Sequence, residues 1–330
     1  MRGAGVIHLL RILGAGLVVQ LCLFGALLAL LSLAGWWNGW LDVLASFAPI
    51  WLIVCLLGAA VAWPALPPGV REPALAAAAA GVLACVLMMA PELLRSTAPA
   101  RHGEKLGQPL KVLTFNVWDD NRHAALTADA ILASGADVVA LQEFFGLTAL
   151  ETDRLQAAYP YRAQCPAGCD LLLMSKRPWL GSTPEAAQRD PGDVAIWAQT
   201  TAPDGRPVTI LTTHYPWPGP PRSQRRARQI VAHDVAGLAK DDLIVTGDFN
   251  LTPWTAALKR QDHEFAPLVR RTRAVYSWPA WIARLDAPAP FAIFPIDQFY
   301  AGPDWRTLAV QRLRRAGSDH YGVMVTLARP

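Results

Sequence analysis

Polar residues that can bind metal ions or phosphate recur at the ends of apolar, β-prone runs in the last two-thirds of the chain. They form six motifs: Phe115-Asn116-Val117, Leu141-Gln142-Glu143, Thr212-Thr213-His214, Gly247-Asp248-Phe249-Asn250, Pro295-Ile296-Asp297 and Gly317-Ser318-Asp319-His320. One such motif alone is more often a turn or a helix cap than a catalytic group. Six in succession are hard to explain as turns and indicate a shared site whose residue types can bind a metal ion or phosphate.

The elements that must position these motifs are a mixture of strands and helices. Short β-prone runs bounded by turn residues predict strands at 110–117, 137–142, 170–174, 194–200, 208–214, 243–247, 293–300, 308–313 and 323–327. Apolar periodicity predicts helices at 124–134, 147–158, 223–239 and 255–262. This order of elements predicts an α/β fold in which helices cover the faces of sheets.

The ordered set of motifs resembles the endonuclease/exonuclease/phosphatase superfamily, which has the deoxyribonuclease I-like fold. The resemblance covers residues 108–330, and Ser277-Trp278-Pro279 also resembles a segment common in this group. It implies a four-layer α/β/β/α sandwich with the active site at one end of two packed sheets. It also implies an enzyme that hydrolyses phosphoric esters with a divalent metal ion.

The resemblance implies a metal site at three motif residues. Glu143 would hold Mg²⁺, or Mn²⁺ in its place, with help from Asn116 and Asp319. Oxygen ligands with several retained waters are what Mg²⁺ prefers. The ion would polarise a phosphoryl oxygen and offset the charge that builds up in the transition state.

Catalytic roles for the other motif residues also follow from the resemblance. Asp248 would orient and deprotonate the attacking water, and Asn250 would position that carboxylate or the phosphate. His320 would stabilise the phosphoryl charge or protonate the leaving oxygen, with Asp297 as the partner that orients its ring. His214 would be the second imidazole on the phosphate.

The chain departs from the family pattern at two places. The proline that usually follows the last motif is replaced by Tyr321-Gly322, and the fifth motif continues as Ile296-Asp297-Gln298 where histidine is common. Neither departure removes a proposed catalytic atom, so both concern the shape of the pocket more than its chemistry.

Two residues after the third motif are candidates for substrate binding. Arg222 belongs to a basic cluster that is either an exposed helix face or a rim that steers anions to the site. Trp217 could stack on a base, enter a lipid surface or pack a rigid proline loop.

The first 95 residues have a different composition, with few charges and long apolar runs. The runs at about 12–34, 43–63 and 74–94 each approach the ~20 residues that cross a bilayer as a helix. Trp36, Trp37 and Trp40 lie between the first two runs, where indole rings favour the membrane interface. We expect a three-helix membrane anchor at 1–95, a linker at 96–107 and a catalytic domain at 108–330.

Basic residues bear on the orientation of this anchor. Arg2 and Arg11 precede the first run and Arg71 lies in the second loop, which favours a cytoplasmic N-terminus. Three crossings then place the catalytic domain outside the cytoplasm, in the periplasm if the membrane is a bacterial inner membrane. The basic residues that follow the third run argue weakly against this orientation.

Cys165 and Cys169 flank a three-residue loop that a disulfide could close in an oxidising compartment. The alternatives are two free thiols or half of a metal site, although no second Cys/His pair lies nearby to complete such a site. A disulfide would support placement outside the cytoplasm.

The sequence therefore favours a membrane-anchored phosphodiesterase, nuclease or phosphatase. Its substrate could be a lipid head group, a nucleic acid or a small phosphate ester. The net charge of +4 is too mild to indicate nucleic acid, and no dedicated nucleic-acid-binding module is visible. The alternative is a catalytically silent membrane scaffold that uses the fold for binding, which the complete set of metal and base residues disfavours. The sequence sets no oligomeric state.

Overall fold

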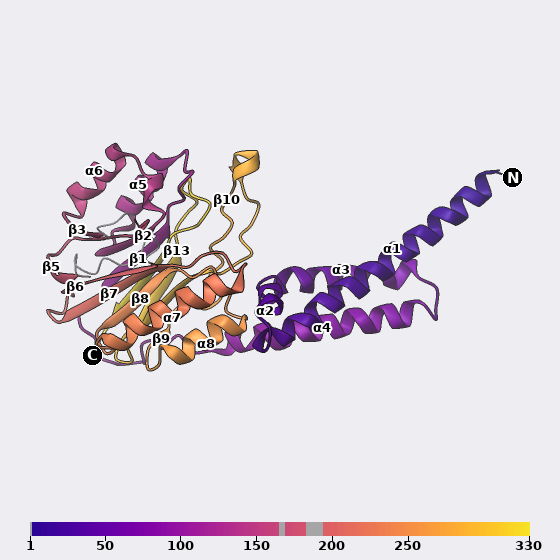
Figure 1. The fold of residues 1–330 in the computed structure, drawn as a ribbon, viewed down its shortest axis with the longest axis horizontal. Helices are drawn as coiled ribbons and strands as arrows, with labels where there is room; N and C mark the ends of the chain where they lie inside the picture. The colour runs from indigo at the N-terminus through magenta and orange to yellow at the C-terminus, as the bar shows by residue number, and fades with distance from the viewer. Residues whose placement is uncertain (1, 165–168, 183–193) are drawn as a thin grey trace. The chain divides into compact units, whose positions relative to one another are not determined.

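The chain forms two compact units. A computed structural model describes residues 2–164, 169–182 and 194–330, and Figure 1 shows the course of the chain. One unit comprises Met1–Leu94 with Trp254–Lys259, and the other comprises Arg95–Pro253 with Arg260–Pro330.

The first unit is helical and apolar. Its elements are α1 (Arg2–Ser32), the 3-10 turn η1 (Leu33–Trp36), α2 (Gly39–Ser46), α3 (Ala48–Ala65) and α4 (Arg71–Leu94). Among the described residues, three segments are long and apolar enough to cross a membrane: Leu10–Trp36, Ala48–Ala65 and Arg71–Leu94. The second of these segments begins at Ala48, later than expected from the sequence, because a separate short helix, α2, precedes it. Asn38 caps α2 by accepting hydrogen bonds from the N–H groups of Trp40 and Leu41.

Glycines allow the three long helices to approach closely. A Cβ added at Gly58 would lie 2.9 Å from the Sγ of Cys22, and one at Gly81 would lie 2.5 Å from the Sγ of Cys55. Small residues at such crossings are typical of membrane helices, which associate by close backbone packing. The large apolar side chains of the same helices, among them Leu17 and Leu57, point outward and are exposed.

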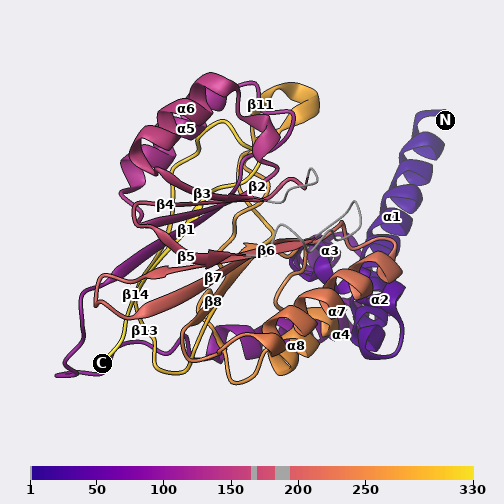
Figure 2. The same ribbon diagram turned by 60° about the vertical axis from the view of Figure 1, so that its left-hand side comes forward.

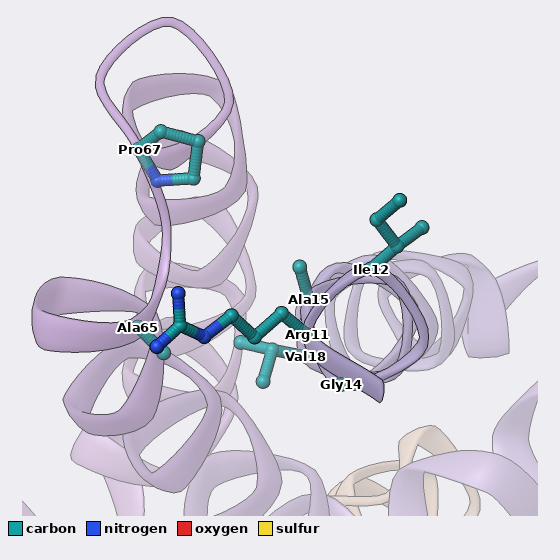
Figure 3. A pocket seen from close by; sticks show the side chains of 7 residues that line it. All are labelled: Arg11, Ile12, Gly14, Ala15, Val18, Ala65 and Pro67. Atoms are coloured by element: carbon teal, nitrogen blue, oxygen red, sulfur yellow. The ribbon is translucent and has the colours of Figure 1, made fainter. Parts of the chain in front are cut away.

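A cavity of about 600 Å³ lies among α1, the end of α3 and the loop that follows α3. It is lined by Arg11, Ile12, Gly14, Ala15, Val18, Ala65 and Pro67, and Arg11 extends across it from α1 (Figure 3). None of these residues belongs to the motifs described above.

In the described residues of the second unit, the strands form two six-stranded sheets. The first has the order β13-β14-β1-β2-β4-β3 and the second has the order β5-β6-β7-β8-β12-β9. In chain order the strands are β1 (Leu110–Asn116), β2 (Val138–Gln142), β3 (Tyr161–Gln164), β4 (Leu172–Ser175), β5 (Trp179–Ser182), β6 (Ala195–Thr201), β7 (Pro207–His214), β8 (Leu243–Asp248), β9 (Val269–Arg270), β12 (Asp297–Ala301), β13 (Arg306–Arg312) and β14 (Val323–Ala328). Among these described strands only β1–β2 and β7–β8 pair in parallel, so the two sheets are mixed and place two parallel pairs at their centres.

The two sheets pack face to face, and helices cover their outer faces. Val112 of β1, Ile210 of β7 and Ile244 of β8 belong to one buried cluster between the sheets. Leu113 and Phe115 of β1 point the other way, into a second cluster under α5 (Ala124–Ser134) and α6 (Ala149–Ala158). Strand β1 is therefore buried on both faces, which explains why apolar residues occur on both of its faces and why only Lys111 of the strand is exposed.

The outer face of the second sheet is covered by α7 (Pro221–Gly237) and by the part of α8 (Ala256–Glu264) that belongs to this unit, from Arg260 onward (Figure 2). The buried side chains of α7 are Gln224, Ala227, Val231 and Val235, which share one face of the helix. The layers are thus α, β, β and α in succession, which confirms the predicted sandwich.

Other elements were not expected from the sequence. A two-stranded hairpin, β10 (Trp281–Ile282) and β11 (Ala287–Pro288), encloses the 3-10 turn η3 (Ala283–Leu285), and another 3-10 turn, η2 (Phe144–Gly146), follows β2. Residues 97–100, in the expected linker, are ordered against β13: Thr307 donates its hydroxyl to the carbonyl of Thr97 at 2.6 Å and its N–H to that of Ala98 at 2.9 Å.

Candidate active site

Strand register brings the motif residues together. Asn116 pairs with Gln142 in the parallel β1–β2 ladder, next to Glu143. In the second sheet Asp248 pairs with His214 in parallel and with Asp297 in antiparallel register. Because the ends of these strands coincide, side chains from distant parts of the sequence meet at one end of the sandwich.

Backbone geometry at the strand ends is unusual and specific. Gly247 has φ 144°, and a Cβ at this position would lie 1.9 Å from the carbonyl oxygen of Thr213. No other residue type could occupy this position without moving β7 away from β8. Glu143 and Asn250 take the left-handed conformation, with φ 52° and 48°, which turns the chain sharply after each strand.

Asn116 connects the two sheets. Its amide Nδ2 donates to Glu143 Oε1 at 2.7 Å and to Asp248 Oδ2 at 3.1 Å. Glu143 Oε2 accepts a further hydrogen bond from the N–H of Asp119 at 3.0 Å. One amide thus fixes the spacing between the carboxylate of the first sheet and the carboxylate of the second.

Asp248 is a deeply enclosed carboxylate of the site, with 1% of its surface exposed. Its Oδ1 accepts the N–H of Asn250 at 2.9 Å. Burial raises the pKa of Asp248 to about 6, the charge of Asp297 adds to the rise, and the imidazoles of His320 and His214 oppose it. A carboxyl group with a pKa in this range can act as a base near neutral pH.

His320 lies between two carboxylates. Its Nδ1 is 3.0 Å from Asp297 Oδ2 and its Nε2 is 3.5 Å from Asp248 Oδ2. Burial favours the neutral ring, but the charges of Asp297 and Asp248 outweigh burial and raise the pKa of His320 to about 10. The imidazole is therefore a cation at neutral pH and can donate a proton or stabilise negative charge.

The imidazole of His214, like that of His320, interacts with carboxylates through both of its ring nitrogens. Its Nδ1 lies 2.5 Å from Asp170 Oδ2, and its Nε2 lies 3.6 Å from Glu143 Oε1 and 3.8 Å from Asp248 Oδ2. Burial lowers the pKa of His214, whereas the hydrogen bond with Asp170 and the neighbouring carboxylates raise it, to about 9. Sequence reasoning missed Asp170 because it included this residue in the predicted strand 170–174, whereas β4 begins at Leu172 and Asp170 lies in the turn before it. An acidic residue in a turn directly before an apolar strand was the available signal.

A model of the Endonuclease/Exonuclease/phosphatase family matches residues 113–320, which contain all of these side chains. The chain belongs to this family. The resemblance drawn from the motifs is thereby confirmed.

Solved structures of the Endonuclease/Exonuclease/phosphatase fold resemble the chain at low identity. One is D. rerio TDP2 complexed with single strand DNA product, with 18% identity, a TM-score of 0.51 and coverage of 67% of this chain and 99% of that one. Another, an endonuclease/exonuclease/phosphatase from Beutenbergia cavernae, has 20% identity, a TM-score of 0.50 and coverage of 67% and 72%. A beta toxin mutant from Staphylococcus aureus with bound magnesium ions has 14% identity, a TM-score of 0.50 and coverage of 66% and 99%. These likenesses support the fold, and comparison with curated proteins gave no match.

The donor set of this family member fits a hard divalent cation. Burial and the charges of Glu143 and Asp170 raise the pKa of Asp119, and burial also raises the pKa of Asp319. The neighbouring imidazoles therefore do not fully offset the burial and mutual repulsion of these carboxylates. Mg²⁺ or Mn²⁺ would relieve that repulsion, with Glu143, Asn116 and Asp319 as the residues to hold the ion.

The remaining predicted residues lie at the margin of the site or outside it. Trp217 is 62% exposed and its ring meets that of Trp278 edge to face, with centroids 5.6 Å apart. Arg222 is exposed in the first turn of α7. Cys169 packs against the core between the sheets, and Cys165 lies outside the described residues.

Proposed function

We propose that the chain is a membrane-anchored, divalent-metal-dependent phosphoester hydrolase. The observation that carries the proposal is the position of Asp248, whose Oδ2 lies 3.5 Å from the Nε2 of His320 and 3.8 Å from the Nε2 of His214. Each imidazole is backed by its own carboxylate, Asp297 or Asp170. A buried base between two cationic imidazoles suits attack of water on a phosphate.

The catalytic residues differ in charge, and we assign their roles in the reaction accordingly. Asp248 accepts the proton of the attacking water, and Asn250 holds the Asp248 carboxylate through its N–H. His320 and His214 are cations at neutral pH and lie where negative charge develops on the phosphoryl oxygens or the leaving oxygen. Preorganised groups of this kind require little rearrangement during the reaction.

A divalent cation at Glu143, Asn116 and Asp319 would supply Lewis acidity to a phosphoryl oxygen. The contribution of the chain is to hold these oxygen donors in place. Asn116 binds Glu143 from one side and the backbone of Asp119 binds it from the other, at 2.7 and 3.0 Å.

The first unit supports placement at a membrane. Its three long apolar segments carry exposed leucines that a bilayer would cover. With a cytoplasmic N-terminus, three crossings place the catalytic unit on the opposite side, in the periplasm if the membrane is a bacterial inner membrane. A phosphoester at or near the bilayer, such as a lipid head group, is the substrate we favour, with nucleic acids and small phosphate esters as the other classes.

The test of substrate class is hydrolysis by the full chain in lipid nanodiscs. The panel comprises phospholipids, sphingomyelin, single- and double-stranded DNA, RNA and small phosphate esters, each with Mg²⁺ and with EDTA. Turnover of one class that EDTA abolishes would support the proposal and name the substrate. A folded protein that binds Mg²⁺ but turns over nothing would favour the catalytically silent scaffold.

A further inference from the structure

Trp278 is attached at both its backbone and its side chain to segments that form the site. Its N–H donates to the carbonyl of Phe294 at 3.1 Å, and Phe294 donates in return at 2.8 Å. Its indole Nε1–H donates to Asp319 Oδ2 at 3.0 Å. The residue therefore joins the segment ahead of β12 to the loop that carries Asp319 and His320.

The indole ring is itself held in place by two aromatic neighbours. The ring of Phe294 lies at a centroid distance of 5.6 Å and a tilt of 32°. The ring of Trp217 lies at 5.6 Å and 85°, edge to face. Both contacts limit rotation of the ring and so restrict the direction in which its N–H can point.

The side chain of Asp319 depends on this hydrogen bond. Its backbone is anchored separately, since its carbonyl accepts the N–H of Ala280 at 2.6 Å. Within the described part of the chain, the indole of Trp278 is the hydrogen-bond donor to the Asp319 carboxylate. Without that donor, the carboxylate could rotate about its own side-chain torsions.

We propose that Trp278 is a positioning residue, which holds the Asp319 carboxylate in the orientation needed to bind the divalent cation. An indole is suited to this role because it is a donor only and cannot compete for the metal. It is also neutral, so the full negative charge of Asp319 remains available to the cation. Hydrogen bonds of this kind behind a metal ligand commonly set metal affinity. The inference rests on the proposed function, in which Asp319 is a ligand.

Trp281 provides a matched control. Its indole Nε1–H also donates to a carboxylate, Asp286 Oδ1, at 3.2 Å, on the hairpin β10–β11. Replacing either tryptophan with phenylalanine keeps an aromatic ring and removes only the N–H and the second ring. A general effect of losing an indole would therefore appear in both variants.

The experiment measures Mn²⁺ binding to the full chain in nanodiscs by titration calorimetry, together with thermal unfolding of the metal-free protein. Trp278→Phe should weaken Mn²⁺ binding by roughly 10-fold, whereas Trp281→Phe should change it less than about twofold. Both variants should unfold at nearly the same temperature. Equal affinities of Trp278→Phe and the parent protein would overturn the inference.

A double-mutant cycle separates positioning from a structural effect. In an Asp319→Asn background, Trp278→Phe should cause no further loss of Mn²⁺ affinity, because its target carboxylate is already absent. A loss of the same size in both backgrounds would overturn the inference. If Asp319→Asn itself leaves Mn²⁺ affinity unchanged, the metal assignment in the proposed function fails; if only Trp278→Phe has no effect, the inference alone fails.

Discussion

Asp297 and Asp248 face each other across the antiparallel strands β12 and β8, and both carboxylates contact the imidazole of His320. Asp297 Oδ2 lies 3.0 Å from Nδ1 and Asp248 Oδ2 lies 3.5 Å from Nε2. Strand register places the two aspartates side by side, since paired residues on neighbouring strands project to the same face. The imidazole is thus oriented by one carboxylate while its other nitrogen faces the proposed base.

Removing the charge of Asp297 should affect catalysis through His320. We expect Asp297→Asn to lower kcat by roughly 10²- to 10⁴-fold, the range typical of a lost acid–base group. The pKa of His320 should fall, so the alkaline limb of the pH–rate profile should move to lower pH. Asp286→Asn, at an exposed carboxylate on the hairpin, is the control and should leave both quantities unchanged. An unaltered alkaline limb in Asp297→Asn would contradict the assigned role.

Stability should fall as the pH rises from neutral to alkaline. The pKa values of His214 and His320 are raised in the folded protein, to about 9 and about 10, from about 6.5 in the unfolded chain. A raised pKa stabilises the folded state fully below pH ~6.5, and this contribution is lost as the pH rises through the folded values. Asp248, with a pKa of about 6, titrates below this window.

Urea denaturation of the metal-free protein between about pH 6.5 and pH 10 measures this effect. The free energy of unfolding should decrease across the window in the parent protein. It should decrease less in His320→Gln, which cannot titrate at that position. If the free energy of unfolding depended on pH in the same way in both proteins, the titration of His320 would not be the cause of the loss of stability.

Much of the fold could be predicted because the pattern of apolar residues in each segment matches the burial of that segment in the folded protein. Strand β1 is apolar on both faces, as a central strand between two cores must be, and its ends were predicted almost correctly. The hairpin β10–β11 was missed because its strands have two residues each and lie in a proline-rich stretch, so no periodicity marks them.

The site was predicted less completely than the fold. Residues such as Asn116 and Asp248 stand at the ends of clear strands, and the structure brings them to a hydrogen bond of 3.1 Å. Asp170 could not be recognised from the sequence, because its role depends on its contact with the imidazole of His214, which lies 44 positions away in the chain. The link between Trp278 and Asp319 is likewise a tertiary contact that sequence order does not reveal.

Gly247 should tolerate no side chain. We expect Gly247→Ala to destabilise the fold by about 3 kcal/mol or more, because its Cβ would collide with the backbone of Thr213 and force β7 from β8. At Gly237, at the end of α7, no atom apart from the chain neighbours and the backbone of the same helix lies within 4 Å of the place where a Cβ would lie, so Gly237→Ala should change stability by less than about 1 kcal/mol. Chemical denaturation of both variants tests the difference, and equal stabilities would refute the steric account.

The segment after the last apolar helix should contribute to the stability of the catalytic unit. Thr97 and Ala98 accept hydrogen bonds from Thr307, and the guanidinium of Arg95 donates to the carbonyls of Arg270 and Thr272. At about 1 kcal/mol for each hydrogen bond, a fragment that begins at Gly103 should be roughly 2–4 kcal/mol less stable than one that begins at Arg95. Urea midpoints of the two fragments give the comparison. Identical midpoints would mean that the segment is dispensable.

The central claim is that Asp248, between two imidazoles and beside a metal site, performs phosphoester hydrolysis. The most direct test is turnover of bis(p-nitrophenyl) phosphate by the full chain in nanodiscs, with Mn²⁺ or EDTA, compared with Asp248→Asn. We predict metal-dependent turnover that falls by at least about 10²-fold in the variant, while its unfolding temperature stays close to that of the parent. Turnover that is equal in the parent and the folded variant, or unchanged by EDTA, would contradict the account.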